Sequence, residues 1–278
     1  MKRIAVQGIA GSFHEDAAIR YFDEEVEVVE CKSFTSVCQL IDADEVDYAV
    51  MAIENSIAGS LLKNYQLIRD YHLRIIGEMY LHIQLNLMVV PGVKPENITE
   101  IYSHPIALQQ CMEYIEKYYP NAELHEGMDT AAAAKKIAEE KPKNAASIGN
   151  LRSAELYGLE ILETGIESNK KNYTRFWILS KHGNPTEESN KASICFEVGH
   201  FYGSLARVLN IFGENKINLN KIQSVPILGK PNEYTIHVDL EWEKAEDYDK
   251  AIHQALKNVS SLAILGEYQK GELKIQNQ

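Results

Sequence analysis

The sequence has few of the features that mark secreted, membrane-bound or nucleic-acid-binding proteins. It holds only four cysteines in 278 residues, and no two of them have the CxxC spacing of a zinc or redox site. No apolar run approaches the roughly 18 residues that span a bilayer, and the first one is too short for a signal peptide. Basic residues are outnumbered, with 28 Lys and Arg against 40 Asp and Glu, a formal net charge of −12. These absences predict a cytoplasmic protein that binds neither nucleic acid nor a membrane.

Length and pattern together predict two α/β parts. In residues 1–181 strand-like runs alternate with helical patterns, which is typical of α/β domains with largely parallel sheets. We expect strands at 3–7, 26–31, 48–53, 75–79, 84–90, 100–102, 144–148 and 174–179, and helices at 15–22, 34–43, 60–70, 107–118, 130–140 and 152–157. Residues 182–191 are polar and read as a linker. Residues 192–272 follow the βαββαβ order of a ferredoxin-like domain.

Four polar clusters in the first part share one arrangement, in which a strand ends and a helix begins. They lie at 8–14, 54–60, 103–105 and 127–130. Such turns leave free N–H groups at a helix N-terminus, where the helix dipole favours an anion. Each cluster taken alone is better explained as an ordinary helix cap. Together they favour a carboxylate ligand, whereas the spacing Gly8-x-x-Gly11 lacks the GxGxxG and Walker patterns of nucleotide binding.

A second signal is the Thr174-Arg175 pair, which enters an otherwise apolar strand. Arg175 suits bidentate binding of a carboxylate, with Thr174 facing a cleft, but it is also typical of an exposed strand edge. Glu54 reads as a general acid or base, or as a structural residue. His14 and His104 lie in the polar clusters and could contact a ligand. The nine histidines form no metal-ligand cluster, and no Ser-His-Asp arrangement is defined, so we expect no metal.

Six motifs follow one another along the chain. They are Gly8-x-x-Gly11-Ser12-Phe13, Ile53-Glu54-Asn55-Ser56-x-x-Gly59-Ser60, Ser103-His104-Pro105-x-Ala107-Leu108-x-Gln110-Cys111, Asp129-Thr130-Ala131, Tyr157-Gly158-Leu159 and Asn172-Tyr173-Thr174-Arg175-Phe176. Through these motifs the chain resembles prephenate dehydratases that carry a C-terminal ACT regulatory domain. The resemblance implies a two-lobed catalytic domain, similar to type II periplasmic binding proteins, with the substrate between the lobes. It also implies conversion of prephenate to phenylpyruvate in phenylalanine biosynthesis, with loss of CO2 and water and without a cofactor or metal.

The same resemblance implies which residues act. The catalytic set would be Thr174, Asn55, Ser103 and Gln110, with Thr174 assisting departure of the ring hydroxyl. Substrate contacts would come from Ser12, Phe13, Glu54, Ser56, Gly59, Ser60, His104, Thr130, Asn172, Arg175 and Phe176. The chain departs from the family in the first turn, where Gly-Pro-Glu-Gly-Thr-Phe-Ser-His becomes Gly8-Ile9-Ala10-Gly11-Ser12-Phe13-His14-Glu15, so that His14 stands in the place of a serine.

In the ACT part, the resemblance implies a phenylalanine site at a subunit interface of a homodimer or homotetramer. Its expected residues are Gly203, Ser204, Leu205, Asn218, Leu219, Gln223, Ser224 and Pro226. The usual Glu-Ser-Arg-Pro of the family reads Gln223-Ser224-Val225-Pro226, without either charge. We therefore expect a phenylalanine response that is weaker than, or different from, that of typical relatives.

Two other functions compete with prephenate dehydration. One is dehydration of arogenate, which carries an amino group in place of the keto oxygen. The other is a non-catalytic sensor with the same two-lobed fold. A sensor should have lost the catalytic set, yet Thr174, Arg175, Asn55 and Ser103 are all present. The sequence leaves the choice between prephenate and arogenate open.

Overall fold

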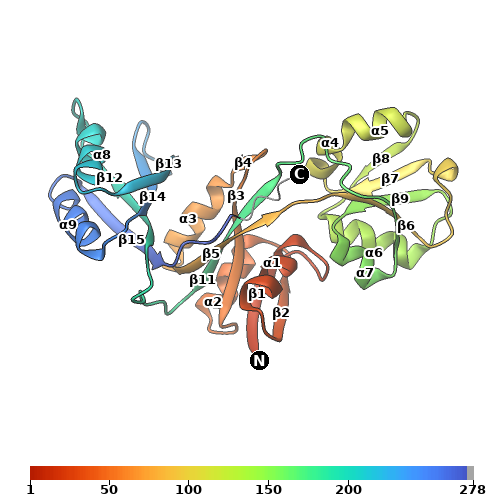
Figure 1. Ribbon diagram of the computed structural model, residues 1–278, viewed down its shortest axis with the longest axis horizontal. Coiled ribbons are helices and arrows are strands. Elements are labelled where there is room, and N and C mark those ends of the chain that lie inside the picture. Colours follow the sequence, from red (N-terminus) through yellow and green to blue (C-terminus); the bar gives the residue numbers. More distant parts are fainter. Residues whose placement is uncertain (274–278) are drawn as a thin grey trace. The chain divides into compact units, whose positions relative to one another are not determined.

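The computed structural model describes residues 1–273, whose elements are labelled in Figure 1. The chain forms two compact units, and each unit combines two stretches that are not consecutive in sequence. The first holds Met1–Leu61 and Met79–Phe176, and the second holds Leu62–Glu78 together with the chain from Trp177 on. The strands β5 (Arg74–His82) and β11 (Tyr173–Ser180) run from one unit into the other. No helix among the described residues is long and apolar enough to cross a membrane.

The N-terminal lobe of the first unit is built on a sheet of order β2-β1-β3-β11-β5, with β4 paired to β3. Its own elements are β1 (Lys2–Gln7), α1 (Phe13–Phe22), β2 (Val26–Cys31), α2 (Phe34–Asp42), β3 (Tyr48–Asn55) and β4 (Gly59–Ser60). The strand β1 runs parallel to β2 and β3. Ile4, Ala5 and Val6 are fully buried, as expected for a central strand covered on both faces.

The other lobe of this unit has a second sheet, of order β10-β6-β9-β7-β8. Its elements are β6 (Asn86–Val89), a 3-10 turn (Pro95–Asn97), β7 (Glu100–Ser103), α4 (Pro105–Gln110), α5 (Met112–Tyr118), β8 (Glu123–Glu126), α6 (Thr130–Glu140), β9 (Ala145–Gly149), α7 (Leu151–Tyr157) and β10 (Glu160–Glu163). β7 is parallel to β8 and β9, but β6 is antiparallel to β9 and β10. This sheet is therefore mixed rather than largely parallel.

The two lobes of the first unit touch where α7 meets the turn after β1. The Tyr157 hydroxyl donates to the carbonyl of Ala10 at 2.6 Å, and Arg152 Nε lies 3.4 Å from Glu15 Oε2. Gly11 has a φ of +86°, and a Cβ there would lie 3.1 Å from Ser153 Cα. Glycine is thus required at this position, both for its backbone conformation and for the close approach of α7.

The C-terminal part has the predicted βαββαβ order. Its elements are β12 (Lys191–Glu197), α8 (Ser204–Glu214), β13 (Asn218–Pro226), β14 (Tyr234–Glu241), α9 (Ala245–Ala255) and β15 (Ser261–Tyr268). They form an antiparallel sheet of order β13-β14-β12-β15, the order of a ferredoxin-like domain. Phe196, Phe212 and Trp242 belong to its buried core.

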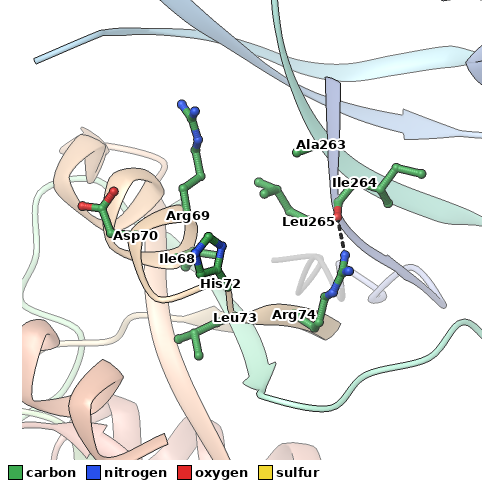
Figure 2. Close-up of a pocket in the computed structure, with 9 residues that line it drawn as sticks. All are labelled: Ile68, Arg69, Asp70, His72, Leu73, Arg74, Ala263, Ile264 and Leu265. Atoms are coloured by element: carbon green, nitrogen blue, oxygen red, sulfur yellow. Dashed lines mark hydrogen bonds between the residues drawn. The ribbon is translucent and has the colours of Figure 1, made fainter. Parts of the chain in front are cut away.

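Within the second unit, α3 (Leu62–Asp70) packs against this ferredoxin-like domain. The ring of Tyr65 lies 5.0 Å from that of His237 and 5.2 Å from that of Trp177. A cavity of about 590 Å³ separates the end of α3 from β15, and Arg74 donates across it to the carbonyl of Ile264 at 2.6 Å (Figure 2). None of the residues expected to bind substrate or effector lines this cavity.

Candidate active site

A cleft of about 350 Å³ opens in the first unit, lined from both of its lobes. This volume lies in the range of small-molecule sites. The cleft is lined by Gln7, Ser12, Phe13, His14, Ala52, Asn55, Ala58, Gly59, Ser60, Leu61, Ile83, Leu85, His104, Ile106, Ala107, Gln110, Met128, Asp129, Thr130, Thr174 and Phe176. Polar and apolar side chains are both present, so the cleft suits a ligand with a ring and several oxygen atoms.

A chain of side-chain amides orients Thr174. Asn55 Nδ2 donates to Thr174 Oγ1 at 3.0 Å and to Asn172 Oδ1 at 2.8 Å. Asn172 Nδ2 donates in turn to Gln110 Oε1 at 2.9 Å. Because the hydroxyl of Thr174 accepts from an amide, its own proton is left to donate elsewhere. Thr174 lines the cleft, so that proton is available to a bound ligand.

Three helices begin at the cleft: α1, α4 and α6. Each has a capping side chain in its wall, since Ser12 Oγ accepts from Glu15 N, His104 Nδ1 from Ile106 N, and Asp129 Oδ1 from Ala132 N. The positive ends of three helix dipoles therefore point at one cavity. The arrangement favours anionic groups, although the described lining residues include no lysine or arginine.

The two histidines of the cleft are uncharged donors near neutral pH. Burial lowers the pKa of His14 to about 4. Burial also lowers the pKa of His104, against an opposing effect of the Asp129 and Glu126 carboxylates. Asp129 is the one carboxylate among the described lining residues, and its helix-capping hydrogen bond already uses one oxygen.

The structure brings most of the sequence-predicted site residues together. Ten of the fifteen line the cleft: Thr174, Asn55, Gln110, Ser12, Phe13, Gly59, Ser60, His104, Thr130 and Phe176. Asn172 lies behind the wall, fully buried, and joins Gln110 to Asn55. The Ser56 hydroxyl donates to the carbonyl of Lys171 and accepts from Tyr173 N. Glu54 pairs with Ser60 in the short β3–β4 ladder.

The last two of the five predicted residues that do not line the cleft are Ser103 and Arg175. The fully buried Ser103 donates its hydroxyl to the carbonyl of Ile148 at 2.7 Å, which holds the end of β7. Arg175 is also buried, and its guanidinium carbon lies 5.9 Å from the centre of the Tyr80 ring. Successive side chains alternate across a strand, so Thr174 and Phe176 share one face of β11 and Arg175 takes the other.

The sequence indicated that His14 could contact a ligand but left it out of the expected substrate contacts, as it did Asp129, and both residues line the cleft. Asp129 stood within a quoted motif, so its position was a usable signal. The His14 ring lies 5.4 Å from Phe34 and 5.1 Å from Phe176, contacts that depend on long-range packing.

The second unit holds a separate cavity of about 680 Å³ in the ferredoxin-like domain. Of the eight predicted effector residues, Ser204 and Ser224 line it, with Glu197, Tyr234 and others. The remaining six do not line it. Gly203 caps α8, Pro226 ends β13, and Leu205 and Leu219 pack on the core of the domain. Asn218 donates to the side chain of Asn220, and Gln223 donates to the carbonyl of Ser224.

Comparisons with known proteins agree with the architecture. Residues 4–184 match the family model described as prephenate dehydratase. Arogenate dehydratase 5 of Arabidopsis thaliana is 35% identical, over 96% of this chain and 67% of its own. The bifunctional chorismate mutase/prephenate dehydratase of Aquifex aeolicus is 30% identical, over 98% of this chain and 75% of its own. The crystal structure of an Arthrobacter aurescens prephenate dehydratase in complex with L-Phe has a TM-score of 0.86 at 26% identity, covering 96% of this chain and 89% of that one.

Proposed function

The chain belongs to the prephenate dehydratase family, and we propose that it converts prephenate to phenylpyruvate, CO2 and water in phenylalanine biosynthesis. The observation that carries this proposal is the amide-oriented hydroxyl of Thr174 in a cleft where three helices begin. The family membership makes the chain a dehydratase. The choice of prephenate over arogenate is a separate part of the proposal.

The reaction explains why a hydroxyl donor is needed. As the bond between the ring and its carboxylate breaks, its electron pair enters the ring, and the bond to the ring hydroxyl breaks in turn. The departing oxygen needs a hydrogen-bond donor or a proton to leave as water. Thr174 supplies the hydrogen bond, because Asn55 holds its oxygen as an acceptor and leaves its proton free. Aromatisation provides the driving force for the step.

The cleft also separates two environments for the two carboxylates of prephenate. The starts of α1, α4 and α6 offer main-chain N–H groups to the carboxylate that is retained. Ile83, Leu85 and Phe176 form an apolar part of the wall. The carboxylate lost as CO2 belongs against this part, since strong solvation of the anion hinders decarboxylation.

A turnover assay tests the proposal. Purified protein is expected to form phenylpyruvate from prephenate without added metal or cofactor. Arogenate is assayed beside it, with phenylalanine as the product followed. Absence of product from prephenate would overturn the proposal. A preference for arogenate would identify the protein as an arogenate dehydratase instead.

We further propose that L-phenylalanine regulates the enzyme through the ferredoxin-like domain, acting as an ACT domain. The cavity lined by Ser204 and Ser224 supports this site, and so does the L-Phe complex of the Arthrobacter aurescens relative. Glu197 lines the same cavity, and its carboxylate lies 3.7 Å from Arg69 Nη2 on α3. α3 begins two residues after Ser60, which lines the catalytic cleft.

This link predicts the effect of Arg69→Gln. The variant removes the ion pair with Glu197, and we expect phenylalanine to inhibit it less than the wild type. The expected change in coupling free energy is about 0.5 to 2 kcal/mol. Inhibition curves give the coupling, and calorimetry shows that phenylalanine still binds. Lys135→Gln removes an exposed ion pair on α6 as a matched control. Equal inhibition of Arg69→Gln and wild type would refute the link.

The proposal includes a homodimer or homotetramer, formed through the C-terminal domain. β13 is an edge strand whose residues are exposed alternately along its length, and an unpaired edge is a template for a second chain. The four cysteines are free and buried, which fits a reducing compartment such as the cytoplasm.

A further inference from the structure

His14 occupies a defined position in the cleft. It lies in the first turn of α1, and its ring stands nearly perpendicular to that of Phe176, at 87° and a centroid distance of 5.1 Å. Phe176 follows Thr174 on the same face of β11, so the two residues are about 7 Å apart along the strand. His14 and Thr174 therefore line the same cleft, with Phe176 in contact with the His14 ring.

The hydrogen bonding of His14 determines what it can offer. The main-chain N–H of Ala52 donates to Nε2 at 3.3 Å, so this nitrogen is the acceptor and the ring proton sits on Nδ1. Among the described residues, Nδ1 makes no hydrogen bond. His14 lines the cleft, so its neutral ring has an unused donor at Nδ1, and this nitrogen would still only donate if the ring were protonated.

We propose that His14 makes the cleft selective for a keto acid by donating from Nδ1 to the side-chain keto oxygen of the substrate. This inference rests on the proposed function. In prephenate, the hydroxyl and the side chain stand on opposite carbons of the ring. With the hydroxyl at Thr174, the side chain reaches toward His14.

Arogenate differs at this point alone. Its ammonium group is a donor and a cation, so Nδ1–H would face another donor and both groups would lose a partner. A buried polar group without a partner is destabilising, and sites that depend on such a hydrogen bond reject analogues that cannot make it. The family pattern has a serine here, whose hydroxyl both donates and accepts. We therefore expect His14 to discriminate between prephenate and arogenate more strongly than a serine would.

Two variants distinguish the effect of the hydrogen-bond donor of His14 from the effect of its aromatic ring. His14→Phe keeps an aromatic ring against Phe34 and Phe176 but removes the donor, and His14→Gln keeps a donor without the ring. We measure kcat/KM for prephenate and for arogenate, using arogenate as a competitive inhibitor where it is not turned over. His14→Phe should lower the preference for prephenate about 10- to 100-fold, and His14→Gln should retain more of it. Phe34→Leu, which disturbs the packing and keeps the donor, is the matched control.

The outcomes distinguish the inference from the function on which it rests. Wild-type protein that makes no phenylpyruvate would overturn both. Active wild type with an equal loss for both substrates in His14→Phe would overturn the inference alone, because it would indicate a structural role or a contact with the shared ring carboxylate. An unchanged preference in His14→Phe, or a changed one in Phe34→Leu, would do the same.

Discussion

Replacing Thr174 with alanine is expected to lower kcat on prephenate by about 10²- to 10⁴-fold, the usual contribution of a positioned proton or hydrogen-bond donor. The side chain is small and lies in the cleft wall, and its hydroxyl accepts from Asn55. Asn55 keeps Asn172 as a second partner when the hydroxyl is removed. The loss should thus fall on the chemical step rather than on folding. Phenylpyruvate formation measures kcat, and thermal unfolding confirms that the variant is folded.

Thr174→Ser is the matched control, because it keeps the hydroxyl and loses only a methyl group. We expect it to retain activity within about tenfold of the wild type, far above the alanine variant. An alanine variant as active as the wild type would remove Thr174 from the mechanism. A serine variant as inactive as alanine would show that packing, and not the hydroxyl, accounts for the effect.

Lys191→Met is expected to have the largest effect on stability, about 3 to 5 kcal/mol in the free energy of unfolding. Lys191 Nζ lies 2.8 Å from Glu78 Oε1, and the two side chains are 2% and 0% exposed. The substitution removes the Lys191 ammonium from the buried Glu78 carboxylate, and it also removes the contact of 3.5 Å between Lys191 Nζ and Glu241 Oε1. Glu78 also accepts from the main-chain N–H of Gly271 at 3.1 Å, so the pair joins β5 to both ends of the ferredoxin-like domain within the second unit.

Chemical denaturation measures this loss, and two further variants identify its cause. Adding Glu78→Gln to Lys191→Met should recover part of the stability, because the amide is uncharged and still accepts from Gly271. Lys270→Met removes a lysine that is 55% exposed and lies 3.7 Å from Glu241, a carboxylate that Lys191 also approaches, and it should cost less than about 1 kcal/mol. If Lys191→Met were no more harmful than Lys270→Met, the buried pair would not hold this unit together.

Much of the fold follows from sequence periodicity, and the differences have local causes. The strand at Val26–Cys31 and the helix at Thr130–Glu140 have the predicted bounds. The helix expected over 107–118 is two helices, α4 and α5, because Cys111 between them leaves helical geometry with φ −104° and ψ 8°. β8 and β10 were not predicted. Each has four residues, two of them glutamates, and such short charged strands do not differ from loops in sequence.

The site was predictable as a set of polar turns, but the roles of individual side chains depend on packing. Helix-cap signals located Ser12, His104 and Thr130 at the cleft. The alternation of β11 sets Thr174 and Arg175 on opposite faces. The amide chain through Asn172 could not be derived, since Gln110, Asn55 and Asn172 come from distant segments. The same holds for the grouping of α3 with the C-terminal part, which rests on contacts far apart in sequence.

The stoichiometry of prephenate turnover tests the central claim most directly. Wild-type protein should release one CO2 for each phenylpyruvate formed, at an enzymatic rate that EDTA does not change and that Thr174→Ala abolishes. Prephenate left unconsumed by folded wild-type protein, or a reaction that survives unaltered in Thr174→Ala, would contradict the account.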